Sequence, residues 1–93
     1  MSEIRVTIAN RLGMHARAAA CFVQEASRFQ SEVWLIKDGN KVDGKSMMSV
    51  MMLAAAKGDR VILGAQGEDE EQALLILSRL IGEKFGEDRK GVD

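Results

Sequence analysis

The fold of this chain is decided by residues 32–43, which read EVWLIKDGNKVD. Residues 32–37 are rich in branched and aromatic side chains, a composition typical of a β-strand. Residues 38–40, DGN, are a hairpin turn signal, and residues 41–43 supply a short return strand. This hairpin predicts two neighbouring antiparallel strands, around which the other elements are arranged.

Two further strands are predicted on either side of the hairpin in the sequence. Apolar and polar residues alternate over residues 4–8, and residues 60–65 show a similar single apolar face. Four strands that each bury one face predict an open sheet, covered by helices on one side and facing water on the other. Trp34 and Ile36 fall on the side that faces water and are expected to be isolated exposed residues.

Three helices are expected between and after these strands. Apolar residues recur at helical spacing over about residues 16–28, and a shorter helix is predicted over about residues 47–53. A third helix follows the acids at residues 68–71, where the helix macrodipole favours negative charge. The predicted element order is β-α-β-β-α-β-α. We expect one α+β domain over residues 1–86 and a polar C-terminal tail over residues 87–93.

The composition excludes several classes of function. The formal net charge is −1, which argues against a general nucleic-acid binder. No apolar stretch approaches the ~18 residues of a membrane span, and the N-terminus shows no secretory signal. The single cysteine, Cys21, excludes an internal disulfide, and with one histidine it leaves no metal site to expect. We therefore expect a protein of the reducing cytoplasm, without cofactor or membrane insertion.

His15 is the one histidine of the chain and stands immediately before the helix expected over residues 16–28. A helix N-terminus offers unpaired N–H groups and a partial positive charge, which favour a neutral imidazole and attract the oxygens of an attached phosphoryl group. Arg17 can add a charge-assisted contact to those oxygens. A lone histidine at a helix start is also commonly a polar cap or a surface residue, so the residues alone leave both interpretations open.

Two motifs resemble those of a known family. Residues 10–17, NRLGMHAR, resemble the active-site signature of HPr, the histidine-containing phosphocarrier of the bacterial phosphoenolpyruvate-dependent phosphotransferase system. Residues 44–58, GKSMMSVMMLAAAKG, resemble the second motif of the family at the family's spacing. The resemblance spans about residues 3–85. It implies an HPr-like open-faced β-sandwich with an antiparallel sheet in the order 1-4-2-3.

The resemblance also implies a carrier rather than an enzyme. His15 would take a phosphoryl group on Nδ1 from enzyme I and pass it to an enzyme IIA-type acceptor, in sugar uptake or its regulation. The N–H groups of Ala16 and Arg17 would hold the phosphate. The family usually has proline where this chain has Ala18. Because alanine suits the first turn of a helix, we expect transfer to persist at an altered rate, in a monomeric protein.

The second motif implies a regulatory site and a docking surface. Ser46 is expected to be a helix N-cap. Some members of the family are phosphorylated at the matching serine by an HPr kinase/phosphorylase, so the resemblance makes Ser46 a candidate regulatory site. Val50, Leu53 and Ala54 are expected to form a buried stripe that turns the neighbouring methionines outward. The expected docking residues are Met14, Ala20, Met47, Met48 and Met51.

Three alternatives remain open at this level. A phosphocarrier of the nitrogen-related branch differs in its acceptor, although Ser46 and the methionines after it favour the sugar branch. A regulatory interaction protein with reduced transfer would be expected to replace the histidine; His15 and Arg17 argue against it, whereas Ala18 leaves it open. An RNA- or ligand-binding sandwich would need aromatic or basic residues on the open sheet face, where Trp34 is the one aromatic residue expected.

Overall fold

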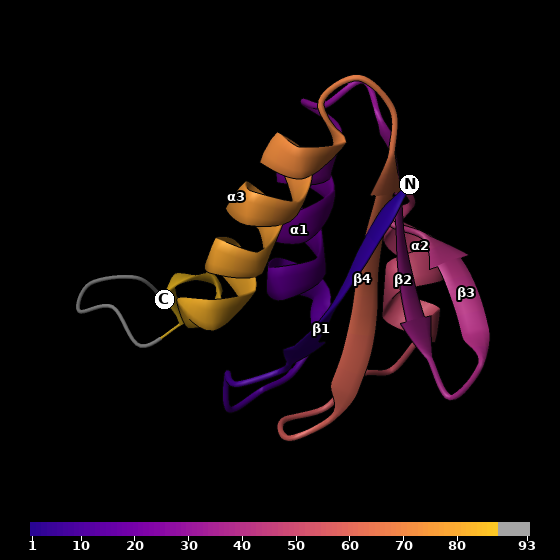
Figure 1. Cartoon of the computed structure of the whole chain (residues 1–93). Coiled ribbons are helices and arrows are strands. Elements are labelled where there is room, and N and C mark those ends of the chain that lie inside the picture. Colours follow the sequence, from indigo (N-terminus) through magenta and orange to yellow (C-terminus); the bar gives the residue numbers. More distant parts are fainter. Residues whose placement is uncertain (88–93) are drawn as a thin grey trace.

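The computed structural model describes residues 1–87, and its elements follow the predicted order with one short helix added at the end (Figure 1). The elements are β1 (Ser2–Thr7), α1 (Ala16–Ala26), β2 (Glu32–Lys37), β3 (Asn40–Asp43), α2 (Met47–Met52), β4 (Arg60–Gln66), α3 (Glu70–Gly82) and the 3-10 helix η1 (Lys84–Gly86). α1 contacts both α2 and α3, so the helices form one layer against the sheet (Figure 1).

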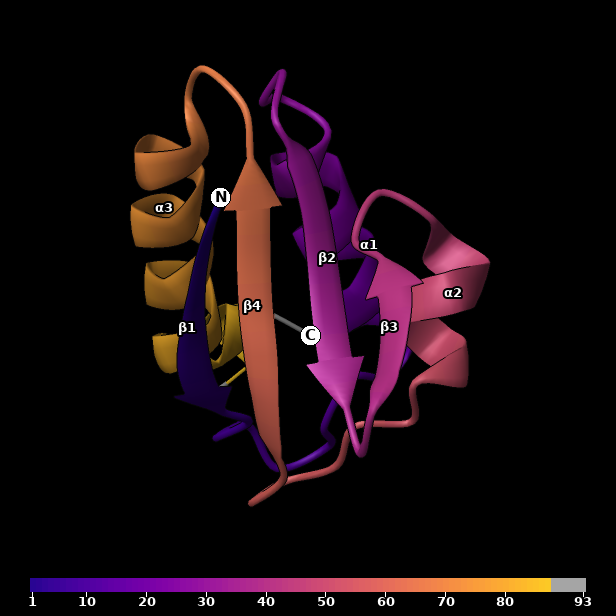
Figure 2. The ribbon, with the colours of Figure 1, turned by 45° about the vertical axis from the view of Figure 1, so that its right-hand side comes forward.

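The four strands form one antiparallel sheet in the order β1-β4-β2-β3, as expected (Figure 2). β2 and β3 form the predicted hairpin, with Lys37 opposite Asn40 at its end. The two residues between them, Asp38 and Gly39, have φ values of 52° and 82°. Two left-handed residues make a two-residue turn whose twist matches that of the strands, which explains the DGN sequence. The α+β sandwich and its strand order are thereby confirmed.

The hydrophobic core lies between the sheet and the helices. Leu35 of β2 stands opposite Leu63 of β4, and both are fully buried. Phe22 of α1 and Leu77 of α3 are buried to the same degree. Each apolar side chain of this size stabilises the fold by roughly 1.5–3 kcal/mol when it leaves water. The N-terminal end of α1 is thus positioned by a helix that is packed firmly on the sheet.

Two helices end earlier than predicted. α1 ends at Ala26 instead of residue 28, because the N–H of Arg28 bonds to the carbonyl of Glu25 in a tighter turn. α2 ends at Met52, and Ala54 beyond it adopts a left-handed conformation with φ of 56°. Ala54 is exposed, so its expected place in the buried stripe of α2 is wrong. The other two members of that stripe are buried.

Trp34 is buried, contrary to the expectation of an exposed residue, although it lies on the sheet face away from the helices. It stands opposite Gly64 of β4, where a Cβ atom would lie 2.2 Å from the indole Nε1. The indole N–H donates to Glu3 Oε2 of β1 at 2.9 Å, and Lys41 Nζ of β3 lies 4.2 Å from the ring centroid. The absence of a side chain at Gly64 lets one indole bridge all four strands.

Candidate functional site

His15 ends the loop between β1 and α1 and is the N-cap residue of α1. Its backbone is extended (φ −77°, ψ 178°), and its carbonyl accepts the first helical hydrogen bond from the N–H of Ala19 at 2.8 Å. Its side chain makes no capping hydrogen bond and is 30% exposed. The imidazole is therefore accessible at the positive end of the helix.

The first turn of α1 presents unpaired donors next to this imidazole. Within residues 1–87, no acceptor contacts the N–H groups of Ala16, Arg17 or Ala18. Such groups attract anions, together with the helix macrodipole. The side chain of Arg17 is exposed and forms no ion pair in the described part of the chain. Ala18 is 1% exposed and belongs to the core, so its N–H is an additional donor that a proline would lack.

The loop that carries His15 is fastened to the loop between α2 and β4. Gly13 has a φ of 67°, and a Cβ atom there would lie 2.7 Å from the carbonyl oxygen of Ala55. This close approach allows the N–H of Met14 to donate to the same carbonyl at 2.8 Å. Asn10 is fully buried and donates from Nδ2 to the carbonyl of Gly13 at 2.7 Å. The position of His15 therefore depends on contacts between segments far apart in sequence.

The loop between α2 and β4 is itself held by a charged pair. The carboxylate of Asp59 accepts a hydrogen bond from the N–H of Ala56 at 2.8 Å and lies 3.2 Å from Lys37 Nζ. Lys37 also donates to the carbonyl of Ala54 at 3.1 Å. The Ala56 N–H and the Lys37 ammonium lower the pKa of Asp59 below its usual value. The ionised carboxylate thus helps to present the Ala55 carbonyl that fastens the loop carrying His15.

Glu87 reaches the same loop from the far end of the chain. Its carboxylate accepts hydrogen bonds from the N–H of Arg11 at 2.7 Å, the N–H of Leu12 at 3.2 Å and Asn10 Nδ2 at 3.0 Å. One carboxylate oxygen lies 3.6 Å from His15 Nε2, and the Glu87 side chain is only 10% exposed. A nearly buried carboxylate is therefore part of the surroundings of the imidazole.

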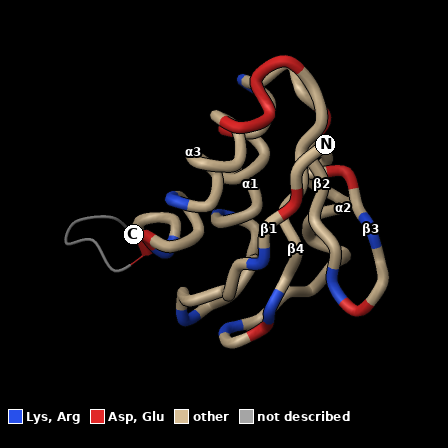
Figure 3. Tube along the Cα trace, viewed as in Figure 1, with Lys and Arg blue, Asp and Glu red and all other residues tan. Residues whose placement is uncertain are grey.

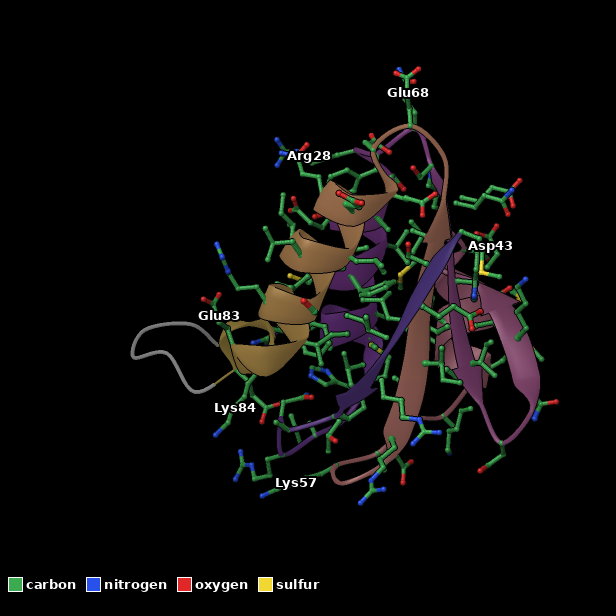
Figure 4. The ribbon with its side chains drawn as sticks, in the orientation of Figure 1. Arg28, Asp43, Lys57, Glu68, Glu83 and Lys84 are labelled. Carbon is green, nitrogen blue, oxygen red and sulfur yellow. The ribbon has the colours of Figure 1, made fainter. Side chains whose placement is uncertain are left out.

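The first residue of the predicted C-terminal tail is bound to the rest of the domain. Residues 87–93 were expected to form a polar tail, whereas Glu87 is bound to the loop before α1. The chain turns back after α3 because Lys84 and Phe85 adopt left-handed conformations, with φ of 61° and 54°. Figure 4 shows Glu83 and Lys84 at this end of α3. Residues 88–93 lie outside the described residues, and nothing in the local sequence marks Glu87 as different from a solvated acid.

A shallow pocket of about 300 Å³ opens beside the imidazole. It is lined, apart from His15, by Arg11, Leu12, Arg17, Ala18, Phe85 and Glu87. Lysines and arginines lie along the end of the molecule that carries this loop, whereas an acidic stretch begins α3 at the opposite end (Figure 3). The surroundings of His15 can therefore accept an anionic group. They also contain one carboxylate, that of Glu87, which offsets part of the positive charge of the two arginines.

The residues expected to dock partners fall into two groups. Met47, Met48 and Met51 are 37%, 73% and 42% exposed, and Ala20 is half-buried. Met14 is 5% exposed and belongs to the core, so its side chain is not presented on the surface with the other expected docking residues. The hydrogen bond from its N–H to the α2–β4 loop fixes the backbone there and turns the side chain inward.

Two further exposed apolar side chains were not predicted as surface residues. Leu12 is 58% exposed in the loop before His15, and Met52 is 76% exposed at the end of α2. Leu12 lies in a turn-rich segment without periodicity, so the sequence carried no signal for its exposure. A partner that approaches His15 meets Leu12 beside the pocket.

Ser46 is the N-cap of α2, as predicted. Its Oγ accepts a hydrogen bond from the N–H of Ser49 at 3.3 Å, and its side chain remains partly exposed. Cys21 is half-buried in α1, and burial raises the pKa of its thiol. A raised thiol pKa disfavours the reactive thiolate, which is consistent with packing as the role of Cys21.

Neither a cluster of metal-binding side chains nor a membrane-spanning helix is present among the described residues. Within residues 1–87, no group of three or more His, Cys, Asp or Glu side chains is placed to hold a metal ion. In the same range, no helix combines the length and apolar character needed to cross a membrane.

The chain is similar to known proteins over nearly its whole length. Residues 2–83 match the family described as PTS HPr component phosphorylation site. Phosphocarrier protein HPr of Neisseria meningitidis serogroup A is 51% identical, with 94% of this chain and 98% of that protein covered. HPr-like protein Crh of Bacillus subtilis is 49% identical, with 90% and 99% covered. The crystal structure of HPr from Thermoanaerobacter tengcongensis superposes with a TM-score of 0.91 at 49% identity, covering 95% and 99%.

Proposed function

Because this chain belongs to the HPr family of phosphocarriers, non-enzymatic components of the phosphotransferase system, we propose that His15 is its phosphoryl acceptor. The imidazole receives the group from phosphorylated enzyme I and passes it to an enzyme IIA-type acceptor in the cytoplasm. One observation carries the proposal: an accessible imidazole without a capping bond stands beside the unpaired N–H groups of Ala16 and Arg17.

The transfer exchanges one phosphorus–nitrogen bond for another. The lone pair of His15 Nδ1 attacks the phosphorus atom while the donor's phosphorus–nitrogen bond breaks and its electron pair stays on the donor nitrogen. The phosphoryl oxygens then face the N–H groups of the first helical turn, and the exposed guanidinium of Arg17 binds them in a charge-assisted contact. The new bond keeps a high transfer potential, so the same exchange runs onward to the acceptor.

Incubation with enzyme I and phosphoenolpyruvate tests this function directly. The purified protein should acquire one acid-labile phosphoryl group and lose it when an enzyme IIA is added. A protein that stays unlabelled would contradict the proposal and would favour a regulatory interaction protein. The acceptor also separates the two branches of the system: Ser46 and the methionines after it favour a sugar-branch acceptor over a nitrogen-branch one.

The exposed side of α2 is the proposed docking surface for these partners. Met47 and Met51 stand one helical turn apart, and Met48 and Ala20 add to the surface. Methionine side chains are flexible and adapt to unlike partners, as a carrier that meets several proteins requires.

Replacing Met51 with aspartate should weaken binding to enzyme I at least tenfold, because a charge would be desolvated in an apolar contact. Met51 is 42% exposed, so the free energy of unfolding should change by less than about 0.5 kcal/mol. Leu75→Asp is the matched control, since Leu75 is a 55% exposed residue of α3. Binding can be measured by titration calorimetry and stability by urea unfolding. Equal binding by the two variants, or a large loss of stability in Met51→Asp, would contradict the docking role.

Ser46 is proposed as a second, regulatory phosphorylation site for an HPr kinase/phosphorylase. A phosphate there adds about two negative charges at the start of α2, beside the docking surface. Replacing Ser46 with aspartate should slow labelling by enzyme I, whereas asparagine should leave it unchanged, because both side chains cap a helix and only one is charged. The measurement is the initial labelling rate at several enzyme I concentrations. Equal rates for the two variants would argue against control by charge at this position.

A further inference from the structure

We propose that the sheet face away from the helices is a second docking surface, which binds an extended acidic segment of a partner protein. The helices form a layer on the other side of the sheet, so a segment bound here leaves His15 and the methionines of α2 uncovered (Figure 2). The surface is built on one row of four side chains, one from each strand: Arg5, Ile62, Ile36 and Lys41.

The register of the sheet places these four side chains in a line. Arg5 of β1 stands opposite Ile62 of β4. Ile62 stands opposite Ile36 of β2, which in turn stands opposite Lys41 of β3. Leu63, next to Ile62 in sequence, is buried in the core, so the alternation of side chains along a strand turns the row toward the opposite face. The row therefore reads cation, isoleucine, isoleucine, cation.

The centre of the row is apolar and hollowed. Ile36 and Ile62 are half-buried, but neither belongs to the core. Both line a hollow of about 280 Å³, together with Arg5 and Arg60. The hollow lies open on the sheet face, whereas a pocket for a small ligand normally buries roughly 70–90% of that ligand. It therefore suits one apolar side chain that projects from a larger partner.

The positive charges of this surface are not neutralised within the described chain. Arg5, Arg60 and Lys41 are exposed, and within residues 1–87 none of them pairs with a carboxylate. Arg60 stands opposite Thr7 and is thus the diagonal neighbour of Arg5 on the same face. Like charges this close on adjacent strands repel each other, so carboxylates of a partner would relieve the repulsion.

The carboxylates on the same face restrict where an acidic segment can lie. Glu3 accepts the indole N–H of Trp34 at 2.9 Å, and Asp43 accepts the N–H of Lys45 at 2.9 Å. Glu3 and Asp43 belong to the next row along the strands, where they repel a segment that binds out of register. Asp38, in the β2–β3 turn, lines the hollow and disfavours a third carboxylate at its centre.

The length of the row determines the spacing within the segment. Neighbouring strands lie about 4.8 Å apart, so the backbones at Arg5 and Lys41, separated by three such spacings, are about 14 Å apart. In an extended chain, residues i and i+4 are about 13 Å apart and point to the same side as residue i+2. An extended segment that crosses the strands with an acid, an apolar residue and an acid at these three positions therefore matches the row.

The test titrates the peptide acetyl-Glu-Ser-Leu-Ser-Glu-amide into the ¹⁵N-labelled full chain. We expect the backbone amide shifts to move at Arg60 and at the four residues of the row, and to stay unchanged in α2 and in the loop before α1. The peptide acetyl-Glu-Glu-Leu-Ser-Ser-amide has the same composition and charge but adjacent acids. It should bind about threefold more weakly, because it loses one of two exposed charge contacts.

Substitutions in the protein give the second measurement. Arg5→Gln and Lys41→Gln should each weaken binding of the first peptide about threefold, and the double variant about tenfold, because the two contacts are far apart. Arg79→Gln is the matched control, since it removes an exposed cation from α3 and should leave the affinity unchanged. Absence of binding, equal affinity in all variants, or shifts centred on the start of α1 would overturn the proposal. Shifts of this face that depend on protein concentration without peptide would also overturn it, because the face would then join two copies of the chain.

Discussion

Replacing His15 with alanine is expected to abolish labelling by enzyme I and phosphoenolpyruvate. Without the imidazole, the site contains N–H groups and an arginine that bind an anion but no nucleophile to accept it. The loss should be complete, because a carrier is consumed and regenerated with every transfer. The measurement is incorporation of labelled phosphate, followed by its release in dilute acid, in which a phosphorus–nitrogen bond is labile.

The variant should otherwise behave as the unmodified protein does. The His15 side chain makes no capping hydrogen bond and is 30% exposed, so its removal should change the free energy of unfolding by less than about 0.5 kcal/mol. It should also bind enzyme I, since the proposed docking surface is intact. Acid-labile label that persists in His15→Ala would contradict the assignment of the acceptor. If His15→Ala lost both its label and its fold, the same labelling would be measured in His15→Gln.

The second large effect is expected at Gly13, where alanine should destabilise the fold by about 2–4 kcal/mol. A side chain in the left-handed conformation costs about 1–2 kcal/mol, and overpacking adds a similar amount. The overpacking arises because the new Cβ would lie 2.7 Å from Ala55 O and 2.9 Å from Ala56 Cα, both backbone atoms. Relief requires the two loops to separate, which would break the hydrogen bond from Met14 to Ala55.

Gly58→Ala is the matched control for this prediction. Gly58 has a φ of 91°, but nothing lies within 4 Å of the Cβ position, so only the conformational cost of about 1–2 kcal/mol applies. Urea unfolding of both variants separates the two contributions. The Gly13 variant should also label more slowly, because the loop that carries His15 is displaced. Equal stability of the two variants would contradict the role of close packing between the loops.

The order of elements could be predicted because its signals are local, and so could the pair formed by His15 and Arg17. The DGN turn, the alternation over residues 4–8 and the helical spacing of apolar residues after His15 each specify one element within a few residues. The same holds for His15 and Arg17, since a helix N-terminus next to a histidine is visible in the chain itself. The sheet order came from the resemblance to the HPr family, which strand patterns alone do not specify.

Tertiary structure decided the surroundings of that pair. Met14 is buried because a hydrogen bond to a loop about forty residues away turns it inward. Trp34 is buried because Gly64, on a neighbouring strand, leaves room for its ring. The loop that bonds to Met14 and the glycine opposite Trp34 are both distant in sequence from the residue that they bury. No local sequence pattern could therefore predict this burial.

Glu87 shows the difference most clearly. In the sequence it is one acid in a polar segment, and a solvated tail is the natural prediction. In the structure, left-handed residues after α3 turn the chain toward the β1–α1 loop, where three donors bind the carboxylate. The sequence by itself thus determined the nucleophile, the helix behind it and the arginine beside it. Only the folded chain decided which charge faces the other ring nitrogen, because that contact joins residues 15 and 87 through space.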